Sequence, residues 1–168
     1  MPAATPFLTK IVRAVHELAA IIWYGEVFFI SFILVPAFKR LPSASKGPFM
    51  LEVFPRVFHA ATISASLTVA AGLALAWLET GFRLAVFLSG PWGLSILLGG
   101  LMGLFILVMH LTVESAELGK LKNVSPALAA DFPEPLRLLE KRVERIPRAG
   151  FAVLTGTLLL MIYASHGL

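Results

Sequence analysis

Four histidines are the residues of this chain that could do metal or proton chemistry, and each falls within or at the end of a strongly apolar stretch. An imidazole can bind a metal or haem iron and can exchange a proton near neutral pH. Ionisable side chains at membrane depth are rare and usually serve a function. Judged by their depth, His59 and His110 should lie toward one face of a membrane, and His16 and His166 toward the other. The sequence therefore predicts two pairs of metal or haem ligands.

A haem b site is the first interpretation of these pairs, because two imidazoles from facing helices can fill both axial positions of the iron without a cysteine. The chain has no cysteine, which excludes iron–sulfur clusters, thiolate-bound zinc and disulfides. Gly99 and Gly103 precede His110 by eleven and seven residues. On a helix all three fall within about 20° of one stripe, where a flat macrocycle could lie. Arg56, one turn before His59, could meet a haem propionate.

These features also have structural interpretations. Histidines at the ends of membrane spans often rest in the headgroup region, and two small residues four apart favour close helix packing. The pair of His59 and His110 is the stronger haem candidate, and the pair of His16 and His166 is the second.

Glu26 is a further candidate, because it lies near the middle of the first apolar stretch, beside Trp23 and Tyr24. A carboxylate at that depth is costly unless it is protonated or paired. It could stay neutral, bond to another helix, relay protons or bind a cation. Hydroxyl groups that could meet it are Thr62, Ser64, Ser66, Thr68, Thr155 and Thr157. A hydrogen bond that only joins two helices is the structural alternative.

Four apolar stretches must position these residues, at about 11–38, 57–78, 92–113 and 149–165. The chain is 58% hydrophobic and 14% charged, against about half and a quarter in soluble domains. About 20 apolar residues cross the hydrocarbon of a bilayer as a helix. We therefore expect one all-α domain over 1–168, an integral membrane bundle of four transmembrane helices in contact with lipid. Nothing points to nucleic acid.

The basic residues predict the topology. Of the 14 Lys and Arg residues, Lys10, Arg13 and Arg83 belong to one side, and the other eleven belong to the first and third connectors. The positive-inside rule then places both termini outside and those two connectors in the cytoplasm, in a membrane of prokaryotic type.

The charged third connector, about 114–148, has apolar residues at three- and four-residue steps with basic residues between them. The apolar positions are Leu136, Leu139, Val143 and Ile146. This spacing predicts an amphipathic helix, which could lie on an anionic membrane surface or simply join two spans.

The run from His16 through Trp23-Tyr24-Gly25 to Pro36, with Phe54-Pro55-Arg56 and Gly72, resembles the copper-resistance protein D superfamily of small four-helix membrane proteins. The likeness covers about residues 14–80, and that group is similar to b-type membrane cytochromes and to the haem-binding protoporphyrinogen oxidases of bacteria. It implies copper or haem in the membrane and a ligand role for His16. Glu26 stands where the family commonly has a second glycine, and the five methionines are scattered, unlike those of a dedicated copper pathway.

The sequence thus predicts a membrane electron-transfer protein with one or two haems b per chain, or the haem subunit of a larger respiratory or redox complex. Its partners would be quinol or a redox protein. If it is an enzyme, it is an oxidoreductase, because no motif of a hydrolase or kinase is present. Two alternatives stay open. One is a cofactor-free structural or proton-path membrane subunit, in a homo-oligomer or larger complex, and the other is copper handling.

Overall fold

Helices make up the structure of this chain. The computed structural model describes residues 6–121 and 134–166, and these residues contain helices and no strand. The elements are α1 (Pro6–Phe29), the π-helical segment η1 (Ile30–Leu34), α2 (Val35–Lys39), α3 (Ser43–Thr80), α4 (Leu84–Leu88), α5 (Pro91–Leu121) and α7 (Glu134–His166). The all-α prediction is confirmed for this part of the chain.

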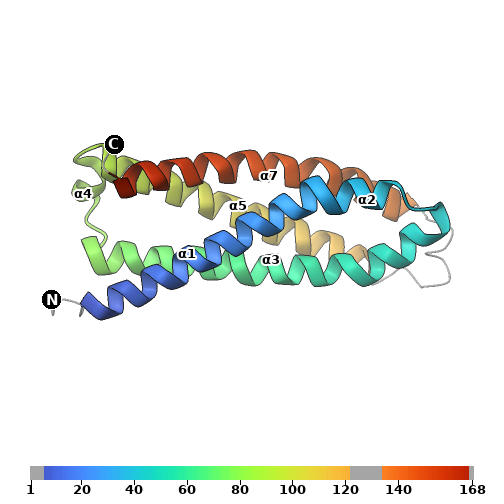
Figure 1. Ribbon diagram of the computed structural model, residues 1–168, viewed down its shortest axis with the longest axis horizontal. Coiled ribbons are helices and arrows are strands. Elements are labelled where there is room, and N and C mark those ends of the chain that lie inside the picture. Colours follow the sequence, from blue (N-terminus) through green and yellow to red (C-terminus); the bar gives the residue numbers. More distant parts are fainter. Residues whose placement is uncertain (1–5, 122–133, 167–168) are drawn as a thin grey trace.

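Four helical stretches within the described residues are long and apolar enough to cross a membrane. They are Pro6–Lys39, Ser43–Thr80, Pro91–Val113 and Leu136–Ser165. Each contains one of the four expected apolar stretches. Figure 1 shows that the start of α1 and the end of α7 lie at the same end of the molecule as α4, whereas α2 and the start of α3 lie at the opposite end.

The helices are longer than hydropathy predicts. At 1.5 Å per residue, the 38 residues of α3 extend about 57 Å, which is nearly twice the roughly 30 Å thickness of bilayer hydrocarbon. The expected second span, about 57–78, is therefore only the second half of α3. Its first half continues away from the apolar stretch, and only residues 40–42 separate it from α2.

A π-helical segment joins α1 to α2. The N–H of Val35 bonds to the carbonyl oxygen of Ile30, five residues back instead of four. Pro36 follows directly and has no N–H to continue the ladder. The wider turn therefore lets one continuous helical stretch pass the proline at the point where it meets α7.

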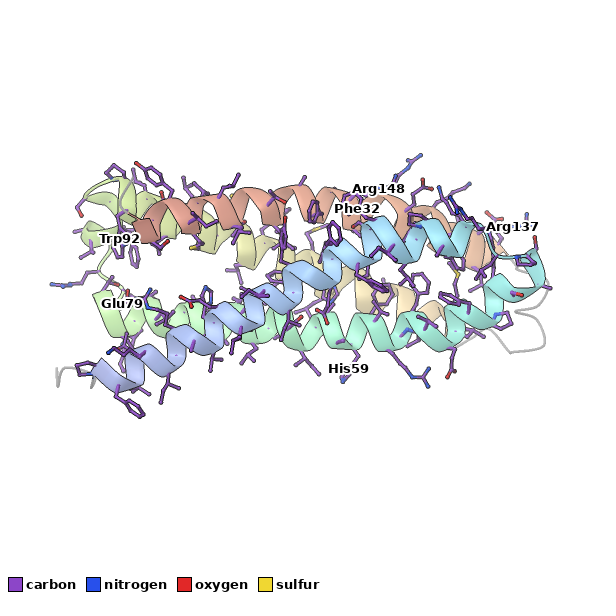
Figure 2. The ribbon with its side chains drawn as sticks, in the orientation of Figure 1. Phe32, His59, Glu79, Trp92, Arg137 and Arg148 are labelled. Carbon is purple, nitrogen blue, oxygen red and sulfur yellow. The ribbon has the colours of Figure 1, made fainter. Side chains whose placement is uncertain are left out.

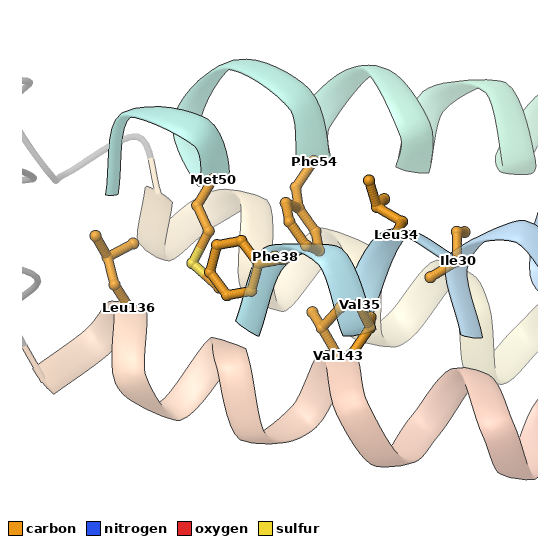
Figure 3. Packing of buried hydrophobic residues seen from close by; sticks show 8 residues of the cluster. All are labelled: Ile30, Leu34, Val35, Phe38, Met50, Phe54, Leu136 and Val143. Atoms are coloured by element: carbon orange, nitrogen blue, oxygen red, sulfur yellow. The ribbon is translucent and has the colours of Figure 1, made fainter. Parts of the chain in front are cut away.

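The end of the molecule that holds α2 has a packed apolar core, and we call this region the headpiece: α2, the first half of α3 (43–56) and the start of α7 (134–148). Its core consists of Leu136 and Val143 from α7, Met50 and Phe54 from α3, and Ile30, Leu34, Val35 and Phe38 from the η1 and α2 region (Figure 3). Met50 and Leu136 are completely buried.

The amphipathic helix of the third connector is thus present, but it is the beginning of α7 instead of a separate surface helix. Its apolar residues Leu136 and Val143 pack against α2 and α3, so these two positions are covered by protein, whereas Ile146 is 40% exposed. Two ion pairs hold the same contact together. Lys39 pairs with Glu144, and Lys46 Nζ lies 2.7 Å from Glu140 Oε1.

A second core cluster lies where the four long helices meet. It takes one buried residue from each: Trp23 of α1, Ala65 of α3, Leu107 of α5 and Leu154 of α7. Trp23 therefore packs between the four long helices.

Candidate functional site

The apolar half of α3 carries two hydroxyl side chains and a glycine in one row, and we call Ser64, Thr68 and Gly72 the polar face of α3. At 100° per residue these three lie within an arc of about 80° and extend about 12 Å along the helix. Glu26 and His16 of α1 meet this face at Ser64 and at the Thr68 carbonyl. Thr62, two residues before Ser64, lies about 160° away around α3 and bonds to His110 of α5.

Glu26 of α1 meets Ser64 of α3. The Ser64 hydroxyl lies 2.5 Å from Glu26 Oε2 and also 3.1 Å from the carbonyl oxygen of Ala61. A hydroxyl has one proton to donate, so it can serve one of these acceptors at a time. When Glu26 is ionised, Ser64 donates to it. When Glu26 is protonated, Glu26 can donate to Ser64, and Ser64 can donate to Ala61. Both states of the carboxyl group therefore keep a hydrogen bond.

His110 of α5 contacts another side of α3. Its Nε2 lies 2.9 Å from the hydroxyl oxygen of Thr62. Two residues correspond to about 3 Å along a helix but to about 160° around it, so the His110 and Glu26 contacts lie at nearly the same depth on different sides of α3.

His16 of α1 is the second residue that meets the polar face. Its Nδ1 lies 2.8 Å from the carbonyl oxygen of Thr68. Since a carbonyl can only accept, Nδ1 carries the proton, and Nε2 of the neutral ring is left as the acceptor nitrogen. The ring rests against Gly72, where a Cβ atom would come within 3.0 Å of His16 Cε1. Glycine at this position makes room for the imidazole.

Tyr24 makes a separate polar contact between α1 and α7. Its hydroxyl lies 3.2 Å from Thr155 Oγ1, which itself donates to the carbonyl oxygen of Phe151. Tyr24 is therefore the donor. Its ring also packs on Phe151, with centroids 5.0 Å apart.

His59 is exposed on α3 (Figure 2), and His110 bonds to Thr62, one turn farther along the same helix. Arg56 is also exposed and bonds to Glu52, one turn earlier on the same helix. The pairing of these two histidines around one haem, with Arg56 on a propionate, stays a prediction.

The predicted stripe of small residues on α5 serves helix packing at one of its two glycines. A Cβ at Gly99 would lie 2.6 Å from the methyl carbon of Met161, so the α7 side chain already occupies that space. A Cβ at Gly103 would meet nothing within 4 Å. His166 ends α7, and its side chain lies outside the described residues. The pairing of His166 with His16 stays a prediction.

No family model, no curated protein and no solved structure matches this chain. The resemblance to copper-resistance protein D therefore stays a prediction, and function must be argued from geometry. Among the described side chains, no three His, Asp or Glu residues gather in a group that could hold a metal ion.

Sequence reasoning missed Ser31, which lies in the π-helical segment. Its side chain is 1% exposed, and its hydroxyl has no hydrogen-bond partner within the described part of the chain. Pro36 five residues later was the available signal, since a proline within a membrane helix often accompanies a local change of helical type.

Proposed function

We propose that this chain crosses a membrane four times and carries protons through its interior at Glu26. Support for membrane insertion comes from the outer surface of the long helices, where large apolar side chains are exposed. Ile21, Ile63, Phe105 and Leu159 provide one example from each helix. Such a surface suits lipid, because all backbone groups of a helix are bonded internally.

Two ion pairs support the placement of the membrane. Arg56 pairs with Glu52 near the middle of α3, and Glu79 near its end pairs with Arg13 of α1. Arg56 and Glu79 are 23 residues apart, which is about 35 Å along a helix, close to the thickness of a bilayer core. In this placement the two pairs lie at the two interfaces, and the headpiece extends into the cytoplasm.

The observation that carries the proposal is the hydrogen bond between Glu26 and Ser64. Ser64 follows Arg56 by eight residues, about 12 Å inside the interface. A carboxyl group at that depth is costly unless it has a role or a partner. Here the partner is a hydroxyl that can serve the ionised and the protonated form equally, so Glu26 can take up and release a proton without losing its hydrogen bond.

His16 extends this site along the polar face. It contacts α3 at Thr68, about 6 Å along the helix from Ser64 and farther from the headpiece. Imidazoles exchange protons near neutral pH, so His16 would accept a proton released by Glu26, with Ser64 turning its hydroxyl as Glu26 changes state. His110 contacts α3 at nearly the same depth as Glu26 but about 160° around the helix, at Thr62, so the polar face does not connect it to Glu26.

Proton flux into reconstituted vesicles tests this function. With a potassium diffusion potential and a pH-sensitive dye trapped inside, vesicles containing the protein should acidify faster than empty ones. Glu26→Gln should remove the difference, since glutamine keeps the size and a hydrogen bond to Ser64 but cannot release a proton. Glu17→Gln is the matched control, because Glu17 is an exposed carboxylate of the same helix. Equal flux with Glu26→Gln and unchanged protein would overturn the proposal.

A haem b electron carrier is the second candidate, and the orientation of His16 favours it. A histidine that ligates a metal commonly donates its other ring N–H to a backbone carbonyl, as His16 does to Thr68. The described residues provide this one imidazole in a suitable orientation, so the fit is to one axial ligand and not to a pair. Haem would supply the redox chemistry, and His16 would hold it. A reduced-minus-oxidised absorption spectrum, with metal analysis for copper, tests this candidate, and His16→Ala should abolish any haem signal.

A further inference from the structure

The start of α7 carries a row of exposed basic side chains that we call the basic edge: Arg137, Lys141, Arg145 and Arg148. At 100° per residue they fall within an arc of about 80° and extend about 16 Å along the helix. Figure 2 shows Arg148 on the side of α7 that faces away from α3.

Two acidic residues of the same segment have partners on other elements. Glu140 pairs with Lys46 of α3, and Glu144 pairs with Lys39 of α2 and more distantly, at 3.8 Å, with Arg148. Two lysines from other elements thus largely neutralise these two carboxylates. Glu134 is exposed at the start of α7, beyond Arg137 and at the far end of the basic edge from Arg148.

The register between α3 and α7 sets the height of the basic edge. Both helices run from the headpiece toward α4 (Figure 1), and Lys46 of α3 pairs with Glu140 of α7. At this offset of 94 residues, Arg148 lies level with residue 54, close to Arg56. If Arg56 marks the interface, Arg148 lies at headgroup height. Arg145 is then about 4.5 Å, Lys141 about 10 Å and Arg137 about 16 Å farther from the membrane.

We propose that the lower end of the basic edge, Arg145 and Arg148, binds the phosphates of anionic phospholipids in the adjacent leaflet. This rests on the membrane placement proposed above but not on proton transport. The headgroup layer on each side is about 5–7 Å thick, so it reaches these two guanidinium groups, which are well suited to phosphate. Lys141 lies near the limit of the surface potential, which falls off over about 8 Å at physiological salt. Arg137 lies beyond it.

The apolar surface of α7, which continues from these two arginines, favours lipid over an acidic protein as the occupant. Exposed Leu158, Leu159 and Ile162 lie on the same helix deeper in the span. A phospholipid offers both an anionic headgroup for the arginines and acyl chains for this surface. A soluble acidic partner offers only the charge.

Thermal unfolding in a neutral detergent tests the proposal, with phosphatidylglycerol or phosphatidylcholine added at equal concentration. Phosphatidylglycerol should raise the midpoint more than phosphatidylcholine does. Arg145→Gln/Arg148→Gln should lose most of that difference, whereas Arg137→Gln should lose little. Lys10→Gln/Arg83→Gln is the matched control, since it removes the same charge from the other end of the molecule and should keep the difference. Native mass spectrometry should count fewer retained phosphatidylglycerol molecules on the first variant alone.

Several outcomes would overturn the proposal. One is an equal loss in both double variants, which would indicate net charge and not a site. Another is equal stabilisation by the two lipids. Inorganic phosphate that reproduces the effect would show a free-anion site, and poly-glutamate that stabilises where phosphatidylglycerol does not would show an acidic protein surface. If the double variant is misfolded by circular dichroism, Arg145→Gln alone replaces it. Glu26→Gln should leave the lipid effect intact, which separates this proposal from proton transport.

Discussion

The headpiece and the polar face of α3 bury opposite kinds of side chain, although α3 contributes to both. In the first half of α3, Met50 and Phe54 point into a closed apolar core and the charges lie at its rim. In the second half, Ile63 and Leu67 are exposed, while Ser64 and Thr68 are buried. The change occurs near Arg56. In the membrane placement proposed above, α3 leaves the headpiece at this point and enters the span.

The difference shows which force holds each region. Burial of apolar surface stabilises a fold in water, because water is the phase that the side chains leave. Between helices in lipid that force is largely absent, and close packing and hydrogen bonds hold the helices instead. We therefore expect stability to depend on apolar volume in the headpiece and on single polar contacts in the span.

The largest effect should come from removing apolar volume from the headpiece. Phe54 is 1% exposed, and Phe54→Ala should lower the free energy of unfolding by about 3–5 kcal/mol, the usual cost of a large core cavity. Phe105→Ala is the matched control, because Phe105 is 61% exposed on α5. Denaturant-induced unfolding in mild detergent, followed by circular dichroism, measures both. Equal losses would mean that the headpiece is not a core of the water-soluble kind.

Hydropathy was enough to predict four helices, since each has an apolar run of spanning length. It could not predict where they end. Residues 43–56 contain enough charged and small residues to resemble a connector, and only their contacts with α2 and α7 show why they stay helical. The spacing of Leu136 and Val143 did predict an amphipathic helix. Its partners, Phe38 and Met50, lie almost a hundred residues away and leave no mark in that spacing.

The candidate site was predictable in depth but not in direction. A residue number fixes how far along a span a side chain lies, and this was sufficient to single out Glu26 and to name Ser64 among its possible partners. The direction around the helix depends on which neighbours pack on which side. That is why Thr62 and Ser64, only two residues apart, meet different helices, α5 and α1.

A smaller effect is expected from the polar face, where one hydrogen bond is at stake. Ser64→Ala should cost about 1–3 kcal/mol, the range for leaving a buried polar group without its partner. The double variant Glu26→Ala/Ser64→Ala should cost less than the two single changes together, because each single change alone removes the one hydrogen bond that the two residues share. Unfolding by denaturant in detergent measures this cycle, with Ser66→Ala as the control on the same helix. Strict additivity would show that the contact contributes nothing to stability.

The smallest changes in the free energy of unfolding should come from breaking the ion pairs. The pair at the rim of the headpiece core should contribute more than the exposed pair on α3. Side chains of Lys46 and Glu140 are 16% and 21% exposed, whereas those of Arg56 and Glu52 are both 69% exposed. Exposed pairs contribute about 0–1 kcal/mol, since water and salt screen them. Glu52→Gln should therefore change the free energy of unfolding very little, and Glu140→Gln should change it by up to about 1 kcal/mol.

The salt dependence of the two substitutions, Glu52→Gln and Glu140→Gln, tests this order. The exposed pair is screened by mobile ions, so any effect of Glu52→Gln should vanish in high salt, whereas part of the Glu140→Gln effect should persist because the Lys46 pair is mostly buried and is screened less. Loss of both effects in high salt would place the Lys46 pair in water like the other. Persistence of the Glu140 effect alone would make the ion pair part of the structure that closes the headpiece over its apolar core.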